Sequence, residues 1–293
     1  MTEEKKRIHV VINPASGQDE SILNTINDVF HKYDIDWSIS ITQKYGDATE
    51  FAQQAAAEGY DIVAGYGGDG TQHEIANGIL GTDAVMGILP GGTGNNFAKE
   101  IGTPETLGPA AELLCTSQNV RKVDVVQMGE ICFILRLYVG IEPEQQTSRE
   151  DKDKYGKLAY LVDSFRKARD SKEVNFRVTV DGEINEGPAM ILYVVNASKN
   201  GAGINVLGDL SKIDDGLMDA FVLNMNDLNT IAGFTDRVLN LDTSNASEYM
   251  RQGKEMTIET EPDQPVWTDG EYSGRTPVSL KVLPAALPVI VPA

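Results

Sequence analysis

The amino-acid sequence predicts a protein of the α/β class with two parts, a parallel sheet covered by helices and then a β-rich region. Two observations support this prediction. Over about the first 130 residues, short apolar runs alternate with segments of helical periodicity, whereas strand-like runs follow one another after about residue 123. Alternating strands and helices are typical of a parallel sheet, and successive strands joined by short turns are typical of an antiparallel sheet or sandwich. The length of 293 residues suits roughly two domains of ordinary size.

The first part contains strands that end at turn residues and helices with one apolar face. Residues 8–12 (IHVVI) form an apolar run that stops at Asn13-Pro14, which is typical of a buried strand. Asp47 followed by Glu50 predicts a capping box, and Gly59 predicts the end of that helix. These patterns predict strands at residues 8–12, 37–41, 62–64 and 85–89, and helices at residues 21–32, 48–59 and 71–80.

The second part is mostly strands. They are predicted at residues 123–128, 131–139, 174–180, 189–196, 219–223, 256–259 and 278–282, with helices at residues 158–167 and 226–239. Asp181-Gly182 is a typical two-residue hairpin turn. The tail, residues 283–293, is apolar and rich in proline, so we expect it to pack on one of the domains.

Composition excludes several classes of function. The formal net charge of −19 argues against a general nucleic-acid binder, because contacts to phosphates need a basic surface. The longest apolar runs are far shorter than the roughly 18 residues of a membrane helix. The first apolar run predicts a strand of a cytoplasmic protein rather than a signal peptide. Transient membrane contact would have to be local, and residues 149–172, with eight basic side chains, are a candidate. A solvated helix face of mixed charge is the favoured interpretation of that segment.

Two glycine-rich loops carry the strongest functional signal. They are 65-GYGGDGT-71 and 88-ILPGGTGNNFAK-99, and each lies between a predicted strand and a predicted helix. Together with 13-NPASG-17 they fall at the carboxyl ends of parallel strands, where ligands bind in open sheets. Glycines let the backbone approach a ligand, and successive N–H groups at a helix start bind phosphate. Neither loop is a Walker P-loop or a GxGxxG fingerprint. The sequence therefore predicts a nucleotide cradle of another kind.

Asp69 stands among these glycines and has two readings. A carboxylate beside polyphosphate is repulsive unless a cation lies between them, so Asp69 is expected to position Mg²⁺-ATP. The alternative is a turn in which the side chain binds its own loop.

The motifs occur in an order that resembles the bacterial diacylglycerol kinases and the sphingosine kinase-like lipid kinases. The matching segments are NPASG (13–17), GGDGT (67–71) followed by Glu74, LPGGTGNNFAK (89–99), KVD (122–124), KLAYL (157–161), DDGLMD (214–219) and TDGE (268–271). GGDGT alone is shared with NAD kinases, but its combination with GTGN and a late DGE is specific. The resemblance implies an NAD-kinase-like first domain, residues 1–125, to which residues 284–293 return. It implies a sandwich-like second domain for the lipid, residues 126–283.

The resemblance also implies roles for individual residues. The lipid kinases use ATP and Mg²⁺ and phosphorylate a membrane lipid. The nucleotide is expected to contact Asn13, Ser16, Gly68, Asp69, Gly70, Thr71, Gly92, Thr93, Gly94 and Asn95. Glu271 corresponds to the general base, with Asp124 in a network of acid, water and Mg²⁺ beside it. Asp215 would hold a structural Mg²⁺ with the backbone carbonyls of Lys212 and Leu217.

Several segments depart from the family pattern and keep alternatives open. Asn96 stands where many bacterial members have Asp, His73 replaces the usual Asn, and residues 138–147 lack most of a glycine-rich segment. Diacylglycerol is the expected acceptor, and a sphingoid or ceramide-like lipid is the alternative. A catalytically weak regulator that binds nucleotide or lipid is a further alternative. The protein is expected at the membrane periphery in the cytoplasm, and the resemblance makes a homodimer plausible.

Overall fold

The computed structural model describes residues 5–16, 20–140, 174–189, 191–197, 211–223 and 250–293. The chain divides into two compact units. The first unit is Met1–Asp124 with Ala285–Ala293, and the second unit is Val125–Pro284. The chain therefore passes from the first unit to the second after Asp124 and returns after Pro284.

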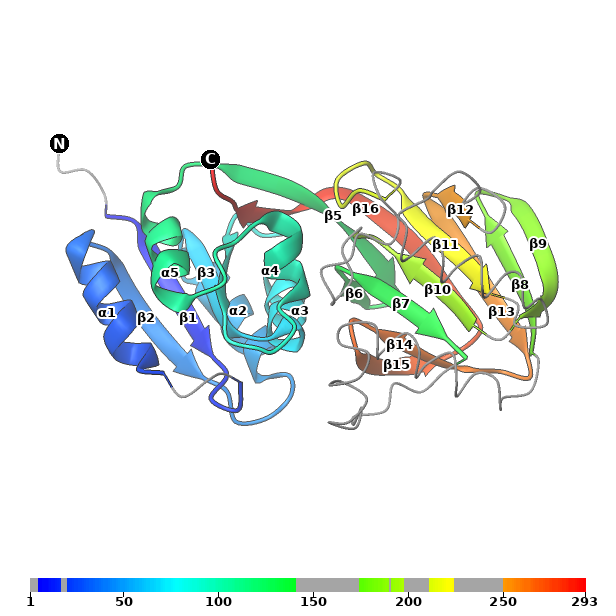
Figure 1. Ribbon diagram of the computed structural model, residues 1–293, viewed down its shortest axis with the longest axis horizontal. Helices are drawn as coiled ribbons and strands as arrows, with labels where there is room; N and C mark the ends of the chain where they lie inside the picture. The colour runs from blue at the N-terminus through cyan, green and yellow to red at the C-terminus, as the bar shows by residue number, and fades with distance from the viewer. Residues whose placement is uncertain (1–4, 17–19, 141–173, 190, 198–210, 224–249) are drawn as a thin grey trace, which may run out of the picture. The chain divides into compact units, whose positions relative to one another are not determined.

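The first unit is a parallel sheet with helices on both faces (Figure 1). Its strands are β1 (Arg7–Ile12), β2 (Asp36–Ile41), β3 (Ile62–Gly67) and β4 (Val85–Pro90), in the order β2-β1-β3-β4. Its helices are α1 (Ile22–Lys32), α2 (Asp47–Ala57), α3 (Asp69–Ile79), α4 (Asn96–Ile101) and α5 (Leu107–Thr116). All six residues of β3 are buried, as both faces of such a sheet are covered.

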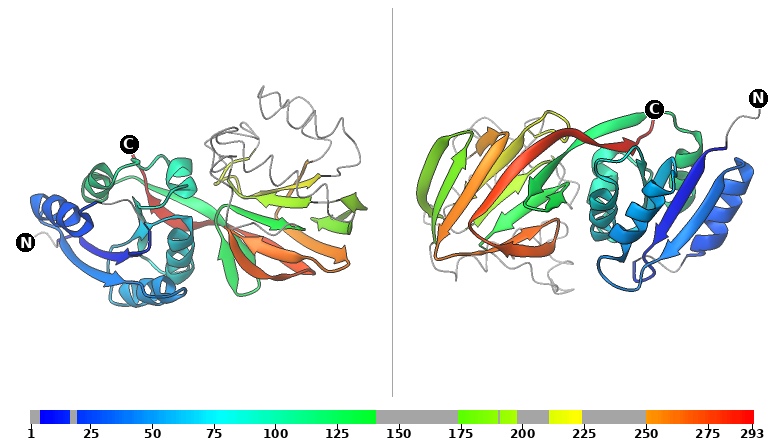
Figure 2. Two further views of the ribbon diagram at one scale, coloured as in Figure 1. Left: turned by 60° about the horizontal axis from the view of Figure 1, so that its bottom comes forward. Right: turned by 180° about the vertical axis from the view of Figure 1, so that it is seen from behind.

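Handedness decides which helix covers which face. The crossover through α1 moves from β1 to β2, whereas the crossovers through α2 and α3 move in the opposite direction along the sheet. Since parallel crossovers are right-handed, α1 must lie on one face and α2 and α3 on the other. Accordingly α1 packs with α5, and α2 packs with α3, as the views of Figure 2 show.

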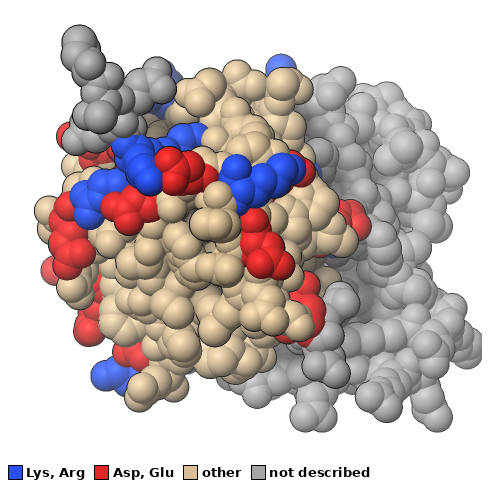
Figure 3. Space-filling view, turned by 90° about the vertical axis from the view of Figure 1, so that its left-hand side faces the viewer, with Lys and Arg blue, Asp and Glu red and all other residues tan. Residues whose placement is uncertain are grey.

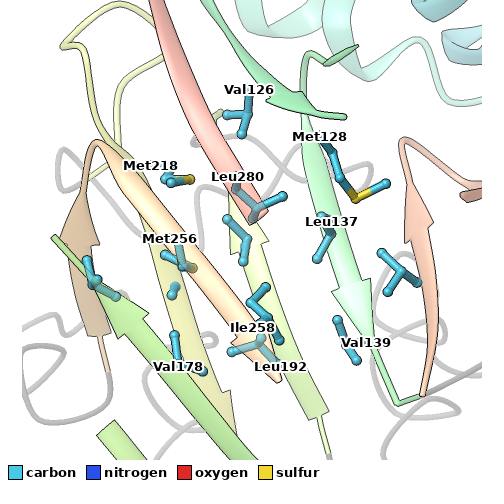
Figure 4. Close-up of a cluster of buried hydrophobic side chains, with 14 of the residues drawn as sticks. Val126, Met128, Leu137, Val139, Val178, Leu192, Met218, Met256, Ile258 and Leu280 are labelled. Carbon is cyan, nitrogen blue, oxygen red and sulfur yellow. The ribbon is translucent and has the colours of Figure 1, made fainter. Parts of the chain in front are cut away.

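The second unit is made of two antiparallel layers around one core. The first layer contains β8 (Val174–Val180), β9 (Glu183–Ala189), β13 (Glu255–Glu261) and the start of β16 (Val278–Ile290), with β5 (Val120–Met128) and β6 (Ile131–Phe133) beside them. The second layer, in order, is β12 (Met250–Gly253), β11 (Met218–Leu223), β10 (Ile191–Val195), β7 (Arg136–Val139), β14 (Pro265–Thr268) and β15 (Glu271–Arg275). Both layers contribute to a buried apolar cluster that includes Val178, Met256, Ile258, Leu137 and Leu192 (Figure 4).

The predicted fold class is confirmed: an α/β unit with a parallel sheet precedes an antiparallel β-rich unit. The apolar tail continues β16, and its residue Val289 pairs with Met86 of β4 in the first unit. The predicted helices at 158–167 and 226–239 lie outside the described residues. Among the described residues, no helix is long and apolar enough to cross a membrane.

Two local predictions were wrong. Residues 131–139 do not form one strand, because the N–H groups of Ile134, Leu135 and Arg136 bind the Asp269 carboxylate and so break the strand into β6 and β7. The capping box at residue 47 is also absent. Asp47 lies inside α2, and its carboxylate accepts hydrogen bonds from the preceding N–H groups of residues 43 and 44.

The start of α2 is instead capped from another helix. Glu74 of α3 accepts hydrogen bonds from the N–H groups of Gly46 and Ala48, at 2.9 and 3.1 Å. Burial raises the pKa of Glu74, while these N–H groups act in the opposite direction. The glutamate that follows GGDGT therefore joins α3 to α2, which is a structural role.

Candidate functional site

The three loops predicted to bind nucleotide meet at the carboxyl edge of the first unit's sheet. They enclose a pocket of about 620 Å³. Of the residues expected to contact the nucleotide, Ser16, Gly68, Asp69 and residues 92–95 line this pocket, whereas Asn13, Gly70 and Thr71 do not. The described residues that line it are Ala15, Ser16, Gly68, Asp69, Pro90, Gly91, Gly92, Thr93, Gly94, Asn95, Ala98, Lys99, Thr103 and Glu105.

The two glycine loops touch along their backbones. The N–H group of Gly91 donates to the carbonyl of Gly67 at 3.0 Å. A Cβ atom on Gly92 would meet the Cα atom of Gly68 at 2.5 Å, which no side chain tolerates. Gly92 is therefore required by close approach of the backbones rather than by an unusual dihedral angle. The contact holds the two loops together under the pocket.

Helix α3 opens onto this pocket. Its first intrahelical bond runs from Gln72 N to the carbonyl of Gly68, at 3.1 Å. The N–H groups of the first turn, residues 69–71, precede that bond and have no acceptor within the helix. Such a turn, in a helix of eleven residues, favours an anion in front of it.

Asn13 organises the first loop instead of lining the pocket. Its side-chain oxygen accepts a hydrogen bond from Ala15 N at 3.0 Å, which shapes the turn. Its amide nitrogen donates to the Thr71 hydroxyl at 3.1 Å, and Thr71 is buried. Asn13 and Thr71 therefore join the first loop to the start of α3. Gly17 lies outside the described residues.

Asp69 joins the two glycine loops. Its Oδ1 atom accepts a hydrogen bond from Phe97 N at 3.0 Å, and its Oδ2 atom accepts one from Asn96 Nδ2 at 2.9 Å. The sequence offered a metal-linked carboxylate or a turn within its own loop, and the structure shows a bond to the other loop. Asn96, the departure from the family pattern, is thus a donor to Asp69. Among the described residues, Asn96 Oδ1 has no hydrogen-bond partner and is buried.

Asn95 fixes the turn of the second loop. It adopts a left-handed conformation with φ of 48°. Its side chain accepts from Gly92 N at 2.9 Å and donates to the Gly92 carbonyl at 2.7 Å. The N–H group of Gly92 is therefore hydrogen-bonded within its own loop, to the Asn95 side chain.

Two features of the pocket were missed by sequence reasoning. Lys99 of α4 lines the pocket, and its ammonium donates to the Gly94 carbonyl at 2.6 Å. Tyr66 is fully buried and lies under Gly91 of the loop at residues 88–99. Its hydroxyl donates a hydrogen bond to Glu20 at 2.7 Å, which joins that loop to the segment that follows residues 13–17. A cation one turn after a glycine loop was a usable signal for Lys99. No local signal indicates that Tyr66 and Glu20 meet.

Glu271, the predicted general base, lies in the second unit at the start of β15. It follows the two-residue turn Asp269-Gly270, whose φ angles are 50° and 101°, and its side chain is exposed. The Asp269 carboxylate accepts three backbone hydrogen bonds of 2.8 to 2.9 Å from residues 134–136. The turn that carries Glu271 is therefore anchored by its first residue.

The predicted structural Mg²⁺ site lies at a turn before β11. Asp215 Oδ1 accepts a hydrogen bond from Leu217 N at 3.0 Å, and Lys212 is exposed. Nearby Asp219 is buried, its Oδ1 atom has no hydrogen-bond partner among the described residues, and burial raises its pKa to about 6. Carboxylate and carbonyl oxygens suit Mg²⁺, so this donor set fits the ion. In the described part of the chain, no group of three or more His, Cys, Asp or Glu side chains is arranged so that it could hold a metal ion.

Asp124 is buried where the chain leaves the first unit. Its Oδ1 atom accepts a hydrogen bond from Ala285 N at 2.6 Å, and Ala285 has a φ of 51°. The carboxylate thus holds the point at which the chain returns. The KLAYL segment and residues 149–172 lie outside the described residues.

Charges on one face of the first unit are mixed. Figure 3 shows Lys and Arg side chains next to Asp and Glu side chains, mainly along the upper part of this view, with uncharged residues over most of the rest. Exposed ion pairs of the first unit include Lys5–Asp34 at 2.6 Å and Lys32–Glu112 at 2.9 Å. The face therefore presents paired charges, not a continuous basic stripe.

The glycine-loop pocket on a parallel sheet, with an antiparallel sandwich after it, defines the class of NAD-kinase-like two-domain proteins, and the comparisons with known proteins agree. Residues 7–128 match the family model of the diacylglycerol kinase catalytic domain. Residues 136–291 match that of the YegS C-terminal NAD kinase beta sandwich-like domain. The chain belongs to the diacylglycerol kinase-like lipid kinase family.

Relatives and solved structures cover nearly the whole chain. A diacylglycerol kinase of Staphylococcus saprophyticus is 28% identical over 299 residues, covering 98% of this chain and 96% of that protein. A diacylglycerol kinase of Staphylococcus aureus is 28% identical, covering 98% of this chain and 93% of that protein. The crystal structure of a diacylglycerol kinase from Bacillus anthracis superposes with a TM-score of 0.82 at 28% identity, covering 98% of this chain and 97% of that one.

Proposed function

We propose that this protein transfers the γ-phosphoryl group of Mg²⁺-ATP to a lipid hydroxyl, with diacylglycerol as the acceptor and phosphatidic acid as the product. The observation that supports this proposal is the pocket of about 620 Å³ at which the two glycine loops meet the start of α3. Backbone N–H groups in such a place bind phosphates. The relatives named diacylglycerol kinase support the choice of acceptor.

In the proposed reaction, the lipid hydroxyl oxygen forms a bond to the γ-phosphorus while the bond from that phosphorus to the bridging oxygen of ADP breaks. The Glu271 carboxylate takes the proton of the hydroxyl and later releases it to water. A positioned base contributes typically ~10²–10⁴-fold to such a step. The exposed side chain and the anchored turn before it support this role for Glu271. Positioning and charge neutralisation supply most of the remaining acceleration.

Three carboxylates have supporting roles in this proposal. Asp69, which lines the pocket, would hold the Mg²⁺ of Mg²⁺-ATP, and this ion would supply neutralisation of phosphate charge. Asp215, with the carbonyls of Lys212 and Leu217, would hold a second, structural Mg²⁺. Asp124 acts through Ala285, by holding the returning chain, and is a positioning residue.

The acceptor also sets where the protein works. Diacylglycerol resides in a bilayer, and no described helix can cross one. We therefore place the protein at the membrane periphery, where it visits the surface transiently. With a net charge of −19, broad electrostatic attraction to anionic lipid is weak. We therefore expect turnover to depend more on how the acceptor lipid is exposed at the bilayer surface than on the content of anionic lipid.

The experiment is a transfer assay with a panel of acceptors. The purified protein is incubated with Mg²⁺ and γ-labelled ATP against diacylglycerol, ceramide, a sphingoid base and NAD, with Glu271→Gln alongside. Label on diacylglycerol, at least ~100-fold slower in the variant, is the expected result.

Other outcomes correct the proposal in defined ways. Label on ceramide or the sphingoid base replaces the acceptor and keeps the reaction. Label on NAD contradicts lipid phosphorylation. ATP binding without transfer to any acceptor supports a regulator, the reading that Asn96 and residues 138–147 leave open.

A further inference from the structure

The charge balance of the glycine-loop pocket rests on one side chain. Among the described residues that line it, Asp69 and Glu105 are acidic and Lys99 is the single basic residue. The whole chain is also strongly acidic, with 44 Asp and Glu against 25 Lys and Arg. A polyanionic ligand entering this pocket therefore meets unfavourable charge unless Lys99 offsets it.

Lys99 is placed at the loop that would hold such a ligand. Its ammonium donates to the Gly94 carbonyl at 2.6 Å, and Gly94 lies between Thr93 and Asn95 in the lining. The side chain is only partly exposed, so its charge is screened less than that of a fully solvated lysine. The hydrogen bond keeps the charge beside the backbone of the second loop.

The neighbouring carboxylate is already compensated within the protein. Both oxygens of Asp69 accept hydrogen bonds from the second loop, from Phe97 N and from Asn96 Nδ2. These two donors therefore stabilise the negative charge of Asp69 even without a bound ligand.

We propose that Lys99 is the phosphate-binding cation of this pocket, and that it selects nucleoside polyphosphates according to their number of phosphates. This rests on the proposed function and deepens it. A compact ammonium is a point charge that suits phosphate oxygens. The contribution of such a charge grows with the charge of the ligand, so it discriminates ATP from AMP and adenosine.

The test is calorimetric binding of ATP, ADP, AMP and adenosine to the full chain in the presence of Mg²⁺. Lys99→Met removes the charge and keeps the length of the side chain. Lys99→Arg keeps the charge. Lys44→Met is the matched control, because Lys44 is an exposed lysine of the same unit that does not line the pocket.

The expected result for Lys99→Met is a roughly 10- to 100-fold loss of ATP affinity, a smaller loss for ADP, and almost none for adenosine. The dependence of ATP affinity on salt becomes weaker, while Lys99→Arg retains most of the affinity and Lys44→Met all of it. Thermal melting of each variant shows whether it is folded.

Three results would overturn the inference. An equal loss for all four ligands means that Lys99 only supports the loop through Gly94. Unchanged ATP affinity in a folded Lys99→Met protein that still transfers phosphate means that the charge is not used, and this leaves the proposed function intact. If the unaltered protein binds none of the four ligands, the proposed function fails together with the inference.

Discussion

The bond between Asp69 and Asn96 can be tested by a double-mutant cycle. Asp69→Ala removes the acceptor of two hydrogen bonds, from Phe97 N at 3.0 Å and Asn96 Nδ2 at 2.9 Å. Hydrogen bonds to a charged group contribute about 1.5–3 kcal/mol each, and donors left without a partner add a penalty. Because these contributions are not additive, we expect the free energy of unfolding to fall by roughly 2–4 kcal/mol.

Asp69→Asn separates shape from charge. Its Oδ1 atom can still accept from Phe97 N. Asn96 can turn its amide so that Oδ1, which is buried and has no partner among the described residues, accepts from the new amide. We therefore expect a loss below about 1 kcal/mol. The rate of phosphoryl transfer should fall strongly although the protein stays folded, because the carboxylate charge is gone.

Asn96→Asp makes the opposite change, placing a second carboxylate at the 2.9 Å position of the present amide nitrogen. Two carboxylates at that distance repel, and the pKa of the pair rises. We expect a destabilisation of roughly 1–3 kcal/mol at neutral pH, smaller in acid. The double variant Asp69→Asn/Asn96→Asp restores one carboxylate and one amide, so its stability recovers while transfer stays low.

The cycle consists of the unaltered protein, Asp69→Asn, Asn96→Asp and the double variant. Urea unfolding of these four proteins, with matched m-values, gives the coupling free energy between the two positions. A double variant whose loss equals the sum of the single losses would refute the reasoning, because the two side chains would then be energetically independent. Recovery of transfer in the double variant would show that the position of the charge does not matter.

Three further changes have defined outcomes. Tyr66→Phe removes the hydroxyl bound to Glu20 and keeps the ring under the second loop, so thermal unfolding should reveal a loss of about 1 kcal/mol; no change would mean that the bond is unimportant. Asp269→Ala removes three backbone hydrogen bonds and should cost about 3–5 kcal/mol and slow transfer by displacing Glu271; normal turnover would contradict an anchored turn. Burial lowers the pKa of His9, so the neutral imidazole contributes to the free energy of unfolding above the ordinary pKa of about 6.5, and this contribution is lost as the pH falls below it. Between about pH 7 and pH 5 the melting temperature should therefore drop less for His9→Gln than for the unaltered protein. An equal drop in the two proteins would contradict this.

The strands of the first unit were predictable from local patterns: β1 and β4 are short apolar runs that end at Asn13-Pro14 and Pro90-Gly91, and β2 (DWSISI) alternates in polarity. The run at residues 8–12 is β1 within one residue, and residues 85–89 correspond to β4 in the same way. In the second unit β9, β12, β14 and β15 were not predicted. Strand β9, for example, reads EINEGPA and has too little apolar alternation to be recognised.

What the sequence could not supply were contacts between distant residues. The break between β6 and β7 depends on a carboxylate more than 130 positions further along the chain. The start of α2 is capped by Glu74 rather than by its own first turn. The glycine loops could be predicted because their spacing is local, whereas the bond from Asp69 to the second loop and the position of Lys99 depend on how those loops meet.

The most direct test of the central claim is phosphoryl transfer from γ-labelled ATP to diacylglycerol by the unaltered protein and by Gly92→Ala. The added methyl group would meet the Cα atom of Gly68 at 2.5 Å and force the two loops apart. Gly187→Ala is the control, because a Cβ atom there meets nothing within 4 Å. We expect transfer by the unaltered protein and the control, and loss of both ATP binding and transfer in a folded Gly92→Ala protein. Transfer by Gly92→Ala at the rate of the unaltered protein would contradict the claim that this pocket holds the nucleotide.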